Sequence, residues 1–548
     1  MNIRPILNFY TSLFAAIGLL FFMFPKALDG QVKLVLSEDF NISANNKLAD
    51  LSQAGGYNSP QFAIADLNND GTGELFIYDR NTQRQFALNL GESGVQTLFK
   101  PNLKLPISDW FKLVDYNCDN IPDLLTGSTG AIAAYPGIYV DNLLQVNENP
   151  RILRSTYQLS TQTFEANIFV NPIDIPIARD MDNDGDIDIL AFSSSGSRVE
   201  FHENVSTGCD LEFRLQSGCY GYFLEAEENA KIELGIDKCP LQVQSTPFLK
   251  HSGTTLFYLD QDRQLILGEL EYDSLVQIQM EPDGMANDSA VSVGLFPLNN
   301  ALAAKEFLAV YDGFNPDEII VAPNTSGSSD TQEAVQRLKR NSKNNWENLD
   351  DNFLHNRMLD LGRNTNTTVF NSEGEIIVLA ATQVQRNSQL QNLIYRFRLE
   401  NKEQLHLVDS CEIVLPNNEI IYSISVSPIS NLLYVGTEGG SIYKVDAGLI
   451  SCNFESDNIQ QLQGSSSSAS TTFSAISATD INGDGLDDLI IGSRNGGMKL
   501  LLGKSSGGLE NFSSIWEEIN VQHPLAPNVF AKPSVFSYAG RDYLWNFS

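Results

Sequence analysis

The sequence predicts an all-β repeat protein, and three observations support this fold class. Strand–loop–strand segments recur along the 548 residues, at intervals of roughly 50 to 80 residues, which is enough for one four-stranded blade with variable outer loops. Short apolar runs alternate with Gly, Asn, Ser and Pro and show little helical periodicity. Hydrophobic residues make up 42% of the chain and charged residues only 19%, so a packed core is expected rather than a disordered acidic chain.

The first thirty residues predict a secretory signal peptide. Arg4 precedes an apolar centre from Leu13 to Phe24, and cleavage after Gly30 would leave residues 31–548 as the mature chain. The alternative is an uncleaved N-terminal anchor, because the uncharged span from Pro5 to Pro25 is long enough to cross a bilayer. No later segment has this character, so a secreted or cell-surface location is expected.

Four loops share one pattern of oxygen ligands, and the clearest is Asp480 to Asp488 in "SAISATDINGDGLDDLIIGS". Side-chain oxygens at loop positions 1, 3, 5 and 9, with a backbone carbonyl at position 7, suit a hard cation that takes six to eight oxygens, which is calcium rather than zinc. About four calcium sites are therefore predicted. In the order of positions 1, 3, 5, 7 and 9, the candidate ligands are Asp66, Asn68, Asp70, Thr72 and Glu74; Asp115, Asn117, Asp119, Ile121 and Asp123; Asp180, Asp182, Asp184, Asp186 and Asp188; and Asp480, Asn482, Asp484, Leu486 and Asp488.

Position 6 of these loops must allow a tight turn. Gly485 meets this need because glycine adopts left-handed backbone conformations freely. Asn120 replaces glycine in the second loop, and asparagine tolerates the left-handed conformation better than most residues, so that site is expected to survive. Asp487 is expected to point to solvent.

Four further segments keep the strand–loop–strand cadence but lack two or more ligands. They lie near Asp260, Asp312, Asn371 and Ser425, and tight turns without metal are expected there. A last strand-like fragment, Ser534 to Phe547, closes the chain. A polar stretch at 329–351 with four cations at 337–343 predicts a short helix or a hairpin excursion, either a solvated loop or a site for an anionic glycan.

Charge and cysteine content restrict the partners and the compartment. The 68 Asp and Glu outnumber 35 Lys and Arg, and the net charge of −33 argues against nucleic-acid binding and for counter-cations. Six cysteines fit an exported protein, in which disulfides persist. No C-x-x-C pair occurs. One bridge is expected within the cluster Cys209, Cys219 and Cys239, and another between Cys411 and Cys452.

These loops resemble the FG-GAP/VCBS repeat, the calcium-loop blade of integrin alpha-subunit propellers and of many secreted bacterial proteins, including those of Bacteroidetes type. The resemblance rests on the four D-x-[DN]-x-D loops, each followed by an apolar strand, and on "LLTGS" and "LIIGS" after two of them. It implies a single β-propeller over 31–548, with calcium loops between the inner strands of several blades and a Cys-containing insert at about 209–245. Eight loop segments favour eight blades; seven is the alternative.

Other motifs fit poorly. An EF-hand needs a bidentate Glu at loop position 12, and the four loops have Ile77, Thr126, Ala191 and Ile491 there. Gly503, Ser505 and Gly507 match G-x-S-x-G, with Glu517 and His523 following in hydrolase order, but no βαβ pattern surrounds them. The five histidines form no ligand-spaced pair.

These observations favour a secreted, calcium-binding propeller that acts as a monomeric adhesion or binding module for an extracellular protein or glycan. No residue is assigned a catalytic role, and a non-enzymatic protein is favoured. The first alternative is a polysaccharide lyase or another carbohydrate-active enzyme, since rhamnogalacturonan-lyase propellers look similar. The second is a passive structural component of a cell-surface assembly.

Overall fold

In the computed structural model, the described residues lie between 41 and 547, with gaps of which the longest are 226–231, 240–252, 298–307, 325–334, 446–457, 464–474 and 512–531. The predicted signal peptide lies outside them. The described residues form β-strands joined by turns and short 3-10 segments, which confirms the all-β prediction. Within this part of the chain, no helix is long and apolar enough to cross a membrane.

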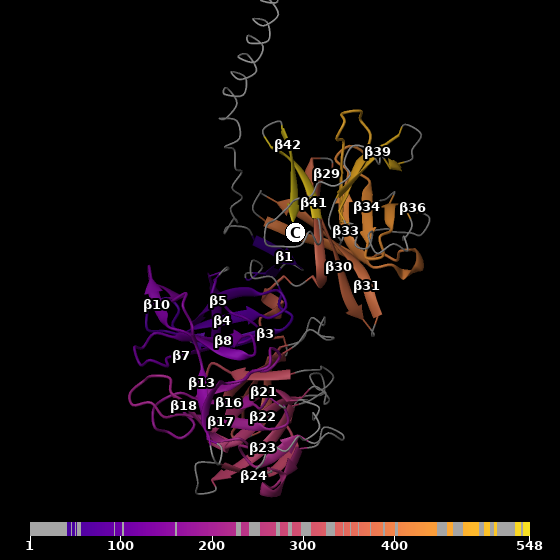
Figure 1. The fold of residues 1–548 in the computed structure, drawn as a ribbon. Helices are drawn as coiled ribbons and strands as arrows, with labels where there is room; N and C mark the ends of the chain where they lie inside the picture. Colours follow the sequence, from indigo (N-terminus) through magenta and orange to yellow (C-terminus); the bar gives the residue numbers. More distant parts are fainter. Residues whose placement is uncertain are drawn as a thin grey trace, which may run out of the picture. The chain divides into compact units, whose positions relative to one another are not determined.

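Five antiparallel sheets between residues 60 and 350 follow one another along the sequence, coloured indigo to rose in Figure 1. Their first strands are β3 (Pro60–Ala65), β7 (Phe111–Val114), β15 (Ile177–Arg179), β21 (Gly253–Leu259) and β25 (Leu308–Asp312). The second strands are β4 (Glu74–Asp79), β8 (Asp123–Ser128), β16 (Asp188–Phe192), β22 (Gln264–Glu269) and β26 (Glu318–Pro323). The outer strands are β5 (Arg84–Gly91), β6 (Gly94–Lys100), β9 (Ala131–Tyr135), β12 (Arg151–Ile152), β17 (Val199–Asn204), β18 (Phe213–Ser217), β23 (Leu275–Pro282), β24 (Asp288–Leu295), β27 (Gln336–Arg340) and β28 (Trp346–Asp350).

The first strands of these five sheets contact one another in a closed cycle. Strand β3 contacts β7, β7 contacts β15, β15 contacts β21, β21 contacts β25, and β25 returns to β3. Backbone and side-chain hydrogen bonds support neighbouring members, including Leu256 N to Ile175 O at 3.0 Å and Thr255 Oγ1 to Leu308 O at 3.2 Å. Five radially packed four-stranded sheets form a five-bladed β-propeller.

Second strands explain why the sequence shows unbroken apolar runs after the loops. Strands β4, β16 and β26 are buried along their whole length. A strand in a blade is covered on both faces by the neighbouring blades, so both of its side-chain rows are apolar, as in other doubly covered sheets.

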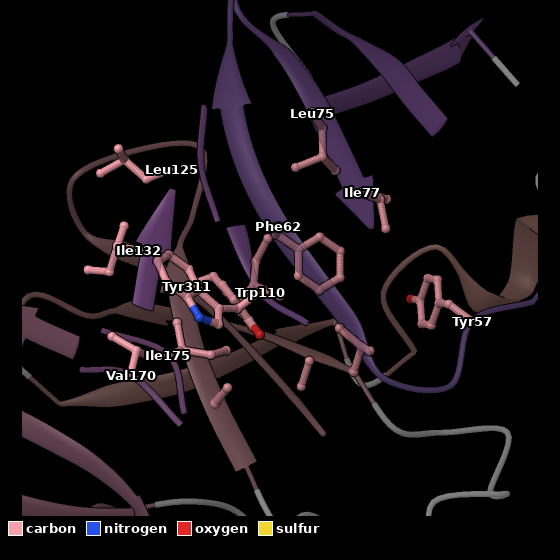
Figure 2. Packing of buried hydrophobic residues seen from close by; sticks show 14 of the residues in the cluster. Tyr57, Phe62, Leu75, Ile77, Trp110, Leu125, Ile132, Val170, Ile175 and Tyr311 are labelled. Carbon is pink, nitrogen blue, oxygen red and sulfur yellow. The ribbon is translucent and has the colours of Figure 1, made fainter. Parts of the chain in front are cut away.

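Side chains from different blades pack against one another near the inner strands of the ring (Figure 2). Phe62 of β3 lies 5.5 Å from Tyr311 of β25, measured between ring centroids, and Trp110 and Ile175 belong to the same buried cluster. Tyr57 donates a hydrogen bond to Phe353 O across the junction of the first and fifth sheets. Side-chain packing therefore holds the two ends of the ring together.

A second series of sheets covers residues 363–547. Its strands are β29 (Arg363–Ser372), β30 (Glu375–Arg386), β31 (Gln389–Glu400) and β32 (Gln404–Glu412); β33 (Ile421–Val426), β34 (Leu433–Thr437), β35 (Ile442–Val445) and β36 (Ile459–Gln463); β37 (Ala475–Thr479), β38 (Asp488–Gly492), β39 (Met498–Gly503) and β40 (Leu509–Asn511); and the hairpin β41 (Lys532–Tyr538) and β42 (Arg541–Phe547). The first strands again contact in order, β29 with β33, β33 with β37, and β37 with β41. Strands β1 (Asn41–Ala44) and β2 (Lys47–Ala49) extend the β29–β32 sheet through β32.

Smaller elements decorate these sheets. Strands β13 (Arg154–Gln158) and β14 (Thr163–Asn167) extend the third sheet at β18. Two hairpins are β10 (Gly137–Val140) with β11 (Leu143–Val146), and β19 (Phe223–Glu225) with β20 (Ile232–Leu234). The 3-10 segments are Ile236–Lys238, Asp260–Asp262, His355–Arg357 and Pro416–Asn418.

The arrangement of blades differs from the prediction. Each of the eight loop segments does join the first and second strands of a sheet, which has four strands in six cases and six strands in the third sheet and the β29–β32 sheet. Among the described residues, however, the cycle of inner-strand contacts closes after five sheets, so a single ring of eight or seven blades is corrected to a ring of five and a second series. The spacing between repeats in the sequence gives the size of one blade. The number of blades in a ring depends on the angle between neighbouring blades, which is set by the packing between them.

Candidate metal loops and a central cavity

The four predicted calcium loops share one backbone geometry. In the loop that starts at Asp480, the carboxylate of Asp480 accepts the N–H of Gly485 at 2.9 Å, and the Asn482 amide oxygen accepts the N–H of Asp484 at 2.9 Å. Asp484 in turn accepts the N–H of Leu486 at 2.8 Å. The bond from position 6 to position 1 recurs in the other loops, from Gly71 to Asp66 at 2.9 Å, Asn120 to Asp115 at 2.9 Å and Gly185 to Asp180 at 3.1 Å.

Position 6 adopts the left-handed conformation in every loop. The φ angle is 84° at Gly71, 63° at Asn120, 99° at Gly185 and 81° at Gly485. The expectation that asparagine could replace glycine in the second loop is therefore confirmed.

The acid at position 9 is the first residue of the second strand and is buried in all four loops. Glu74, Asp123, Asp188 and Asp488 are at most 2% exposed. Each accepts the backbone N–H of loop position 2, for example Ile481 N to Asp488 Oδ2 at 2.9 Å. This carboxylate therefore ties the start of the loop to the strand behind it.

In three of the four loops, a further strand completes the surroundings of the position-9 acid, a contact that sequence reasoning missed. The other carboxylate oxygen accepts the N–H of Gly137 at 2.6 Å, of Asn204 at 2.8 Å or of Gly503 at 2.8 Å. A Cβ atom on Gly503 would lie 2.5 Å from Asp487 O, so the close approach of the strands needs glycine there. This contact explains Gly503 without a hydrolase motif; Ser505 and Gly507 lie outside the described residues.

The third loop gathers the closest group of carboxylates. Asp180, Asp182 and Asp188 can place one oxygen each within 4.8 Å of one another. Burial, with a smaller contribution from neighbouring Asp182 and Asp186, raises the pKa of Asp188 to about 7, although hydrogen bonds from the N–H groups of Asn204 and Met181 act in the opposite direction. One buried carboxylate beside two more accessible ones fits a hard divalent cation, which would offset their repulsion.

The other loops carry the same donor set with an asparagine at position 3. Burial raises the pKa of Asp123 to about 6 and also raises the pKa of Glu74. Among the described residues, the third loop is the one whose carboxylates come within 4.8 Å of one another; the candidate ligands of the other loops share its hydrogen-bonded backbone geometry.

Calcium is expected to reverse the pH dependence of stability. In chelator, Asp188 and Asp123 have folded-state pKa values above their unfolded value of about 4, so their stabilising protonation is present at low pH and is lost as pH rises through about 6 to 7. Each contributes a slope of up to about 1.4 kcal/mol per pH unit. With calcium bound, protons compete with the ion, so stability should instead rise over this range. Urea midpoints at several pH values, with calcium or with EDTA, measure both slopes.

The Asp188→Asn variant serves as the control for this pH effect, because an amide does not titrate. Its midpoint in EDTA should depend less on pH than that of the unaltered protein. Equal slopes with and without calcium would contradict the assignment of these carboxylates to a metal site.

Asp487 does not point to solvent as predicted. Its carboxylate accepts hydrogen bonds from the hydroxyl groups of Ser427, Ser430 and Tyr434, the last at 2.7 Å. All three donors belong to the preceding sheet or its turn. Asp487 therefore joins neighbouring sheets of the second series, a role that only the packing of the sheets reveals.

A disulfide links the second metal loop to the third blade. Cys118, at loop position 4, pairs with Cys209 in the β17–β18 connection, although the sequence analysis placed Cys118 apart from the cluster. The expected bridge within the cluster is Cys219 to Cys239. Cys411 is also disulfide-bonded, and Cys452, its predicted partner, lies outside the described residues.

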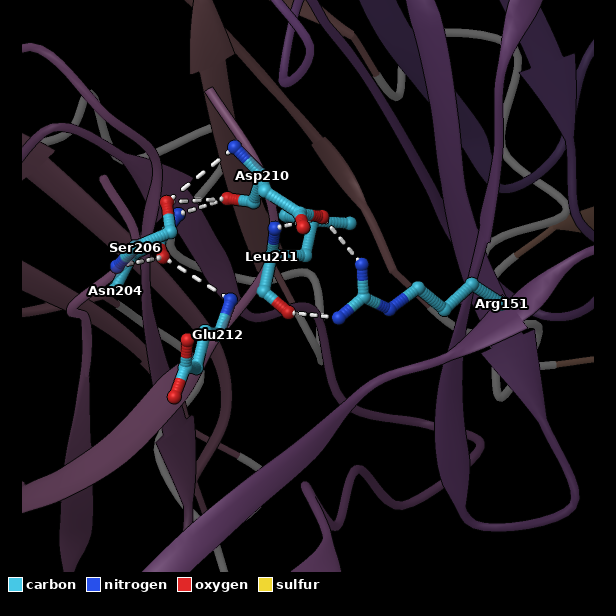
Figure 3. Close-up of polar contacts among 6 residues, drawn as sticks. All are labelled: Arg151, Asn204, Ser206, Asp210, Leu211 and Glu212. Atoms are coloured by element: carbon cyan, nitrogen blue, oxygen red, sulfur yellow. Dashed lines mark hydrogen bonds and ion pairs between the residues drawn. The ribbon is translucent and has the colours of Figure 1, made fainter. Parts of the chain in front are cut away.

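Polar contacts support the same connection (Figure 3). Arg151 of β12 in the second sheet forms an ion pair with Asp210 and donates to Leu211 O. Within the connection, Asn204 and Ser206 both donate to Asp210 O. The disulfide and the ion pair therefore fix two neighbouring blades beside a candidate metal site.

The centre of the ring contains a cavity of about 600 Å³ lined by residues from the first strands of all five blades. Its polar lining includes Lys112 of β7, Arg179 of β15 and Asp312 of β25, and its apolar lining includes Phe62 and Phe314. Cavities of this size hold small ligands. No sequence motif marked these residues, because each comes from a different repeat.

The predicted cluster of cations at 337–343 does not form a free basic patch. It lies on the hairpin β27–β28, where Arg337 and Lys339 pair with buried Glu318 and Arg340 pairs with Asp262. Three histidines lie in the described residues, on separate elements: His202 on β17, His355 in a 3-10 segment and His406 on β32.

Comparison with known proteins gives one family match. Residues 472–509 match the family model of the FG-GAP repeat, a segment that contains the Asp480 loop. In a sequence comparison, no curated protein matches the chain.

Solved structures with some likeness include a candidate 6-phosphogluconolactonase from Bacteroides uniformis and the fucose-specific lectin from Aleuria aurantia. The first is 10% identical over 74% of this chain and 98% of its own, with a TM-score of 0.24. The second is 11% identical over 52% and 86%, with a TM-score of 0.22. At such low TM-scores, neither the fold nor the function of this chain is inferred from these structures. The match at 472–509 identifies the segment around the Asp480 loop as an FG-GAP repeat.

Proposed function

We propose that this protein is an exported, calcium-stabilised β-propeller that binds an extracellular glycan or protein. The observation that carries the proposal is that the candidate metal loops and the cavity are formed by different parts of the ring. The buried position-9 acids tie the metal loops to the strands of the scaffold, whereas a cavity of about 600 Å³ opens among the inner strands. Calcium therefore serves the fold, and ligand binding belongs to the cavity and the connecting loops.

Export is supported by the apolar N-terminal segment, by the disulfides and by the FG-GAP match. Disulfides of this kind persist in oxidising compartments. An acidic net charge of −33 fits a protein that works where calcium is abundant, and a monomer is the proposed state.

A polysaccharide lyase is the second candidate, favoured by two cations in the cavity. Burial lowers the pKa of Lys112, as the chemistry of a general base requires, and Arg179 lies close enough to lower it further. Arg179 would then neutralise the carboxylate of an acidic sugar.

A glycan array combined with a lyase absorbance assay tests the proposal on the purified, calcium-loaded chain. Binding of a defined glycan or protein without product formation supports the binding module. Release of unsaturated product supports the lyase. If the assays detect no binding and no product, both the binding module and the lyase are excluded. A passive structural component of a surface assembly is then the remaining hypothesis.

A further inference from the structure

We propose that the side chains of Arg337 and Lys339 replace the metal ion in the fifth blade, so that calcium stabilises the first three blades of the ring and not the last two. This inference rests on the calcium binding proposed above and adds to it a calcium-dependent change on one side of the cavity. It concerns side chains outside the four candidate metal loops.

Glu318 lies where the metal loops have their position-9 acid. It is the first residue of β26, as Asp123 and Asp188 are the first residues of β8 and β16, and it is 4% exposed. A carboxylate at this place is costly to bury unless a positive charge compensates it. The fifth blade therefore needs a cation at Glu318.

The loop of the fifth blade does not offer the oxygen ligands of a metal. It runs over seven residues from Asp312 to Glu318, against nine residues from Asp180 to Asp188. Positions 3 and 5 are Phe314 and Pro316, whose side chains carry no oxygen. A hard cation that takes six to eight oxygens is therefore not expected in this loop.

The third strand of the fifth blade, β27, supplies the positive charge. Arg337 donates to Glu318 Oε2 through Nε at 3.0 Å and through Nη2 at 2.6 Å, and Lys339 Nζ lies 3.3 Å from Glu318 Oε1. The guanidinium carbon of Arg337 lies 4.4 Å from the centroid of the Phe314 ring, a cation–π contact. Phe314 therefore positions the arginine from the loop position where a metal ligand would lie.

Side chains of the same blade neutralise Glu318. Burial of Glu318 favours its neutral form, but hydrogen bonds from Arg337, Asn315 and Lys339 outweigh this effect and hold the pKa of the carboxyl below its usual value. The Asn315 amide donates to Glu318 Oε1 at 3.0 Å. Glu318 is therefore ionised at neutral pH, and the chain itself provides the compensating charge.

The fourth blade has no acid at this place. Gln264 is the first residue of β22, and its Nε2 atom donates to Gln279 Oε1 of β23 at 3.1 Å. An amide pair is neutral and needs no cation. Outside the ring, the sheet that begins with β29 has the acid–arginine arrangement of the fifth blade, because Glu375 Oε1 at the start of β30 lies 4.0 Å from Arg398 Nη1 of β31.

The three blades with candidate metal loops form one side of the cavity. Val114 and Arg179 line the cavity and directly precede the first candidate ligands of the second and third loops, so local unfolding of these loops would release the adjoining wall. Phe314 of the fifth blade also lines the cavity and adjoins the loop that Arg337 stabilises. Removal of calcium is therefore expected to loosen the walls from the first three blades and to leave those from the last two in place.

Hydrogen exchange of the unaltered chain, in calcium and in EDTA, tests the inference. Calcium at about 100 times its Kd slows local opening of a bound loop by up to about 100-fold. Exchange in β4, β8 and β16 should therefore become about 100-fold faster in EDTA. Exchange in β22 and β26 should change by less than about twofold, since the contacts at the starts of these strands contain no metal.

Two results of this measurement would overturn the inference, with different consequences for the proposed function. Equal acceleration in all five blades would mean that calcium stabilises the ring as one unit, so the calcium-stabilised propeller would stand and the inference would fail. No acceleration in any blade would contradict calcium binding itself and the inference with it.

The Arg337→Met variant tests the replacement directly, because methionine keeps an apolar stem without the charge. Exchange in β26 should become at least about tenfold faster, and by the same factor in calcium and in EDTA, since buried Glu318 loses its main partner. The Lys343→Met variant, which removes an exposed lysine from the turn of the same hairpin, should exchange as the unaltered protein does. An effect of Arg337→Met no larger than that of Lys343→Met, or one that calcium reverses, would overturn the inference.

Discussion

The Asp188→Ala variant is expected to lose about 3–5 kcal/mol of unfolding free energy in calcium. Asp188 is fully buried and accepts the N–H groups of Met181 at 2.9 Å and Asn204 at 2.8 Å. Alanine leaves both buried donors without an acceptor, at roughly 1–3 kcal/mol each, and also removes the proposed innermost calcium ligand of the third loop. Urea denaturation followed by intrinsic fluorescence measures the loss.

Asp184→Ala is the matched control, because Asp184 is an exposed candidate ligand of the same loop. Its carboxylate accepts the N–H of Asp186 and is also hydrogen-bonded to the Asp186 side chain at the exposed surface of the loop. Its loss should therefore cost stability mainly in calcium-loaded protein and little in EDTA. Asp188→Ala should keep about 2 kcal/mol of its cost in EDTA, from the lost backbone contacts. Identical behaviour of the two variants would show that position 9 has no structural role beyond the metal.

Removal of the Cys118–Cys209 disulfide is expected to cost about 3–5 kcal/mol. The bridge spans 91 residues, and the chain-entropy model gives a long loop a larger effect than a short one. Cys118→Asn with Cys209→Ser is the appropriate double variant, because Cys118 has a φ of 58° and the first and third loops place Asn69 and Asn183 in the same left-handed position. Thermal and urea unfolding of the oxidised variants provides the measurement.

The disulfide between Cys219 and Cys239 supplies the comparison, since it closes only 20 residues. Its removal should cost about 1 kcal/mol less than removal of the longer bridge. A larger cost for the shorter bridge would mean that contacts in the folded state, rather than loop entropy, determine the stabilisation.

The local parts of this structure could be predicted from sequence because they are set by neighbours along the chain. The Asp480 loop encodes its own hydrogen bonds in the spacing of three acids and an asparagine, and Gly485 encodes the turn. The same reasoning correctly placed the loops between the first and second strands of their sheets.

Contacts between distant segments were beyond the sequence pattern. In the sequence, Asp487 is an acidic loop residue without an assigned role. In the structure, it accepts a hydrogen bond from Tyr434 of the preceding sheet. Lys112 is one polar residue in an apolar strand, and only the closing of five blades places it opposite Arg179 and Asp312. A repeat interval gives the size of each blade, but the number of blades in a ring depends on side-chain packing at its centre.

Each blade of the ring is built from one continuous stretch of chain, and this has a consequence for synthesis. In the described residues, no strand of the first sheet pairs with a strand of the fifth; the two meet through packing such as Phe62 against Tyr311. Every sheet can therefore form as its segment leaves the ribosome, without waiting for a distant strand. Docking of the fifth blade on the first then joins the two ends of the ring, and it completes the cavity last.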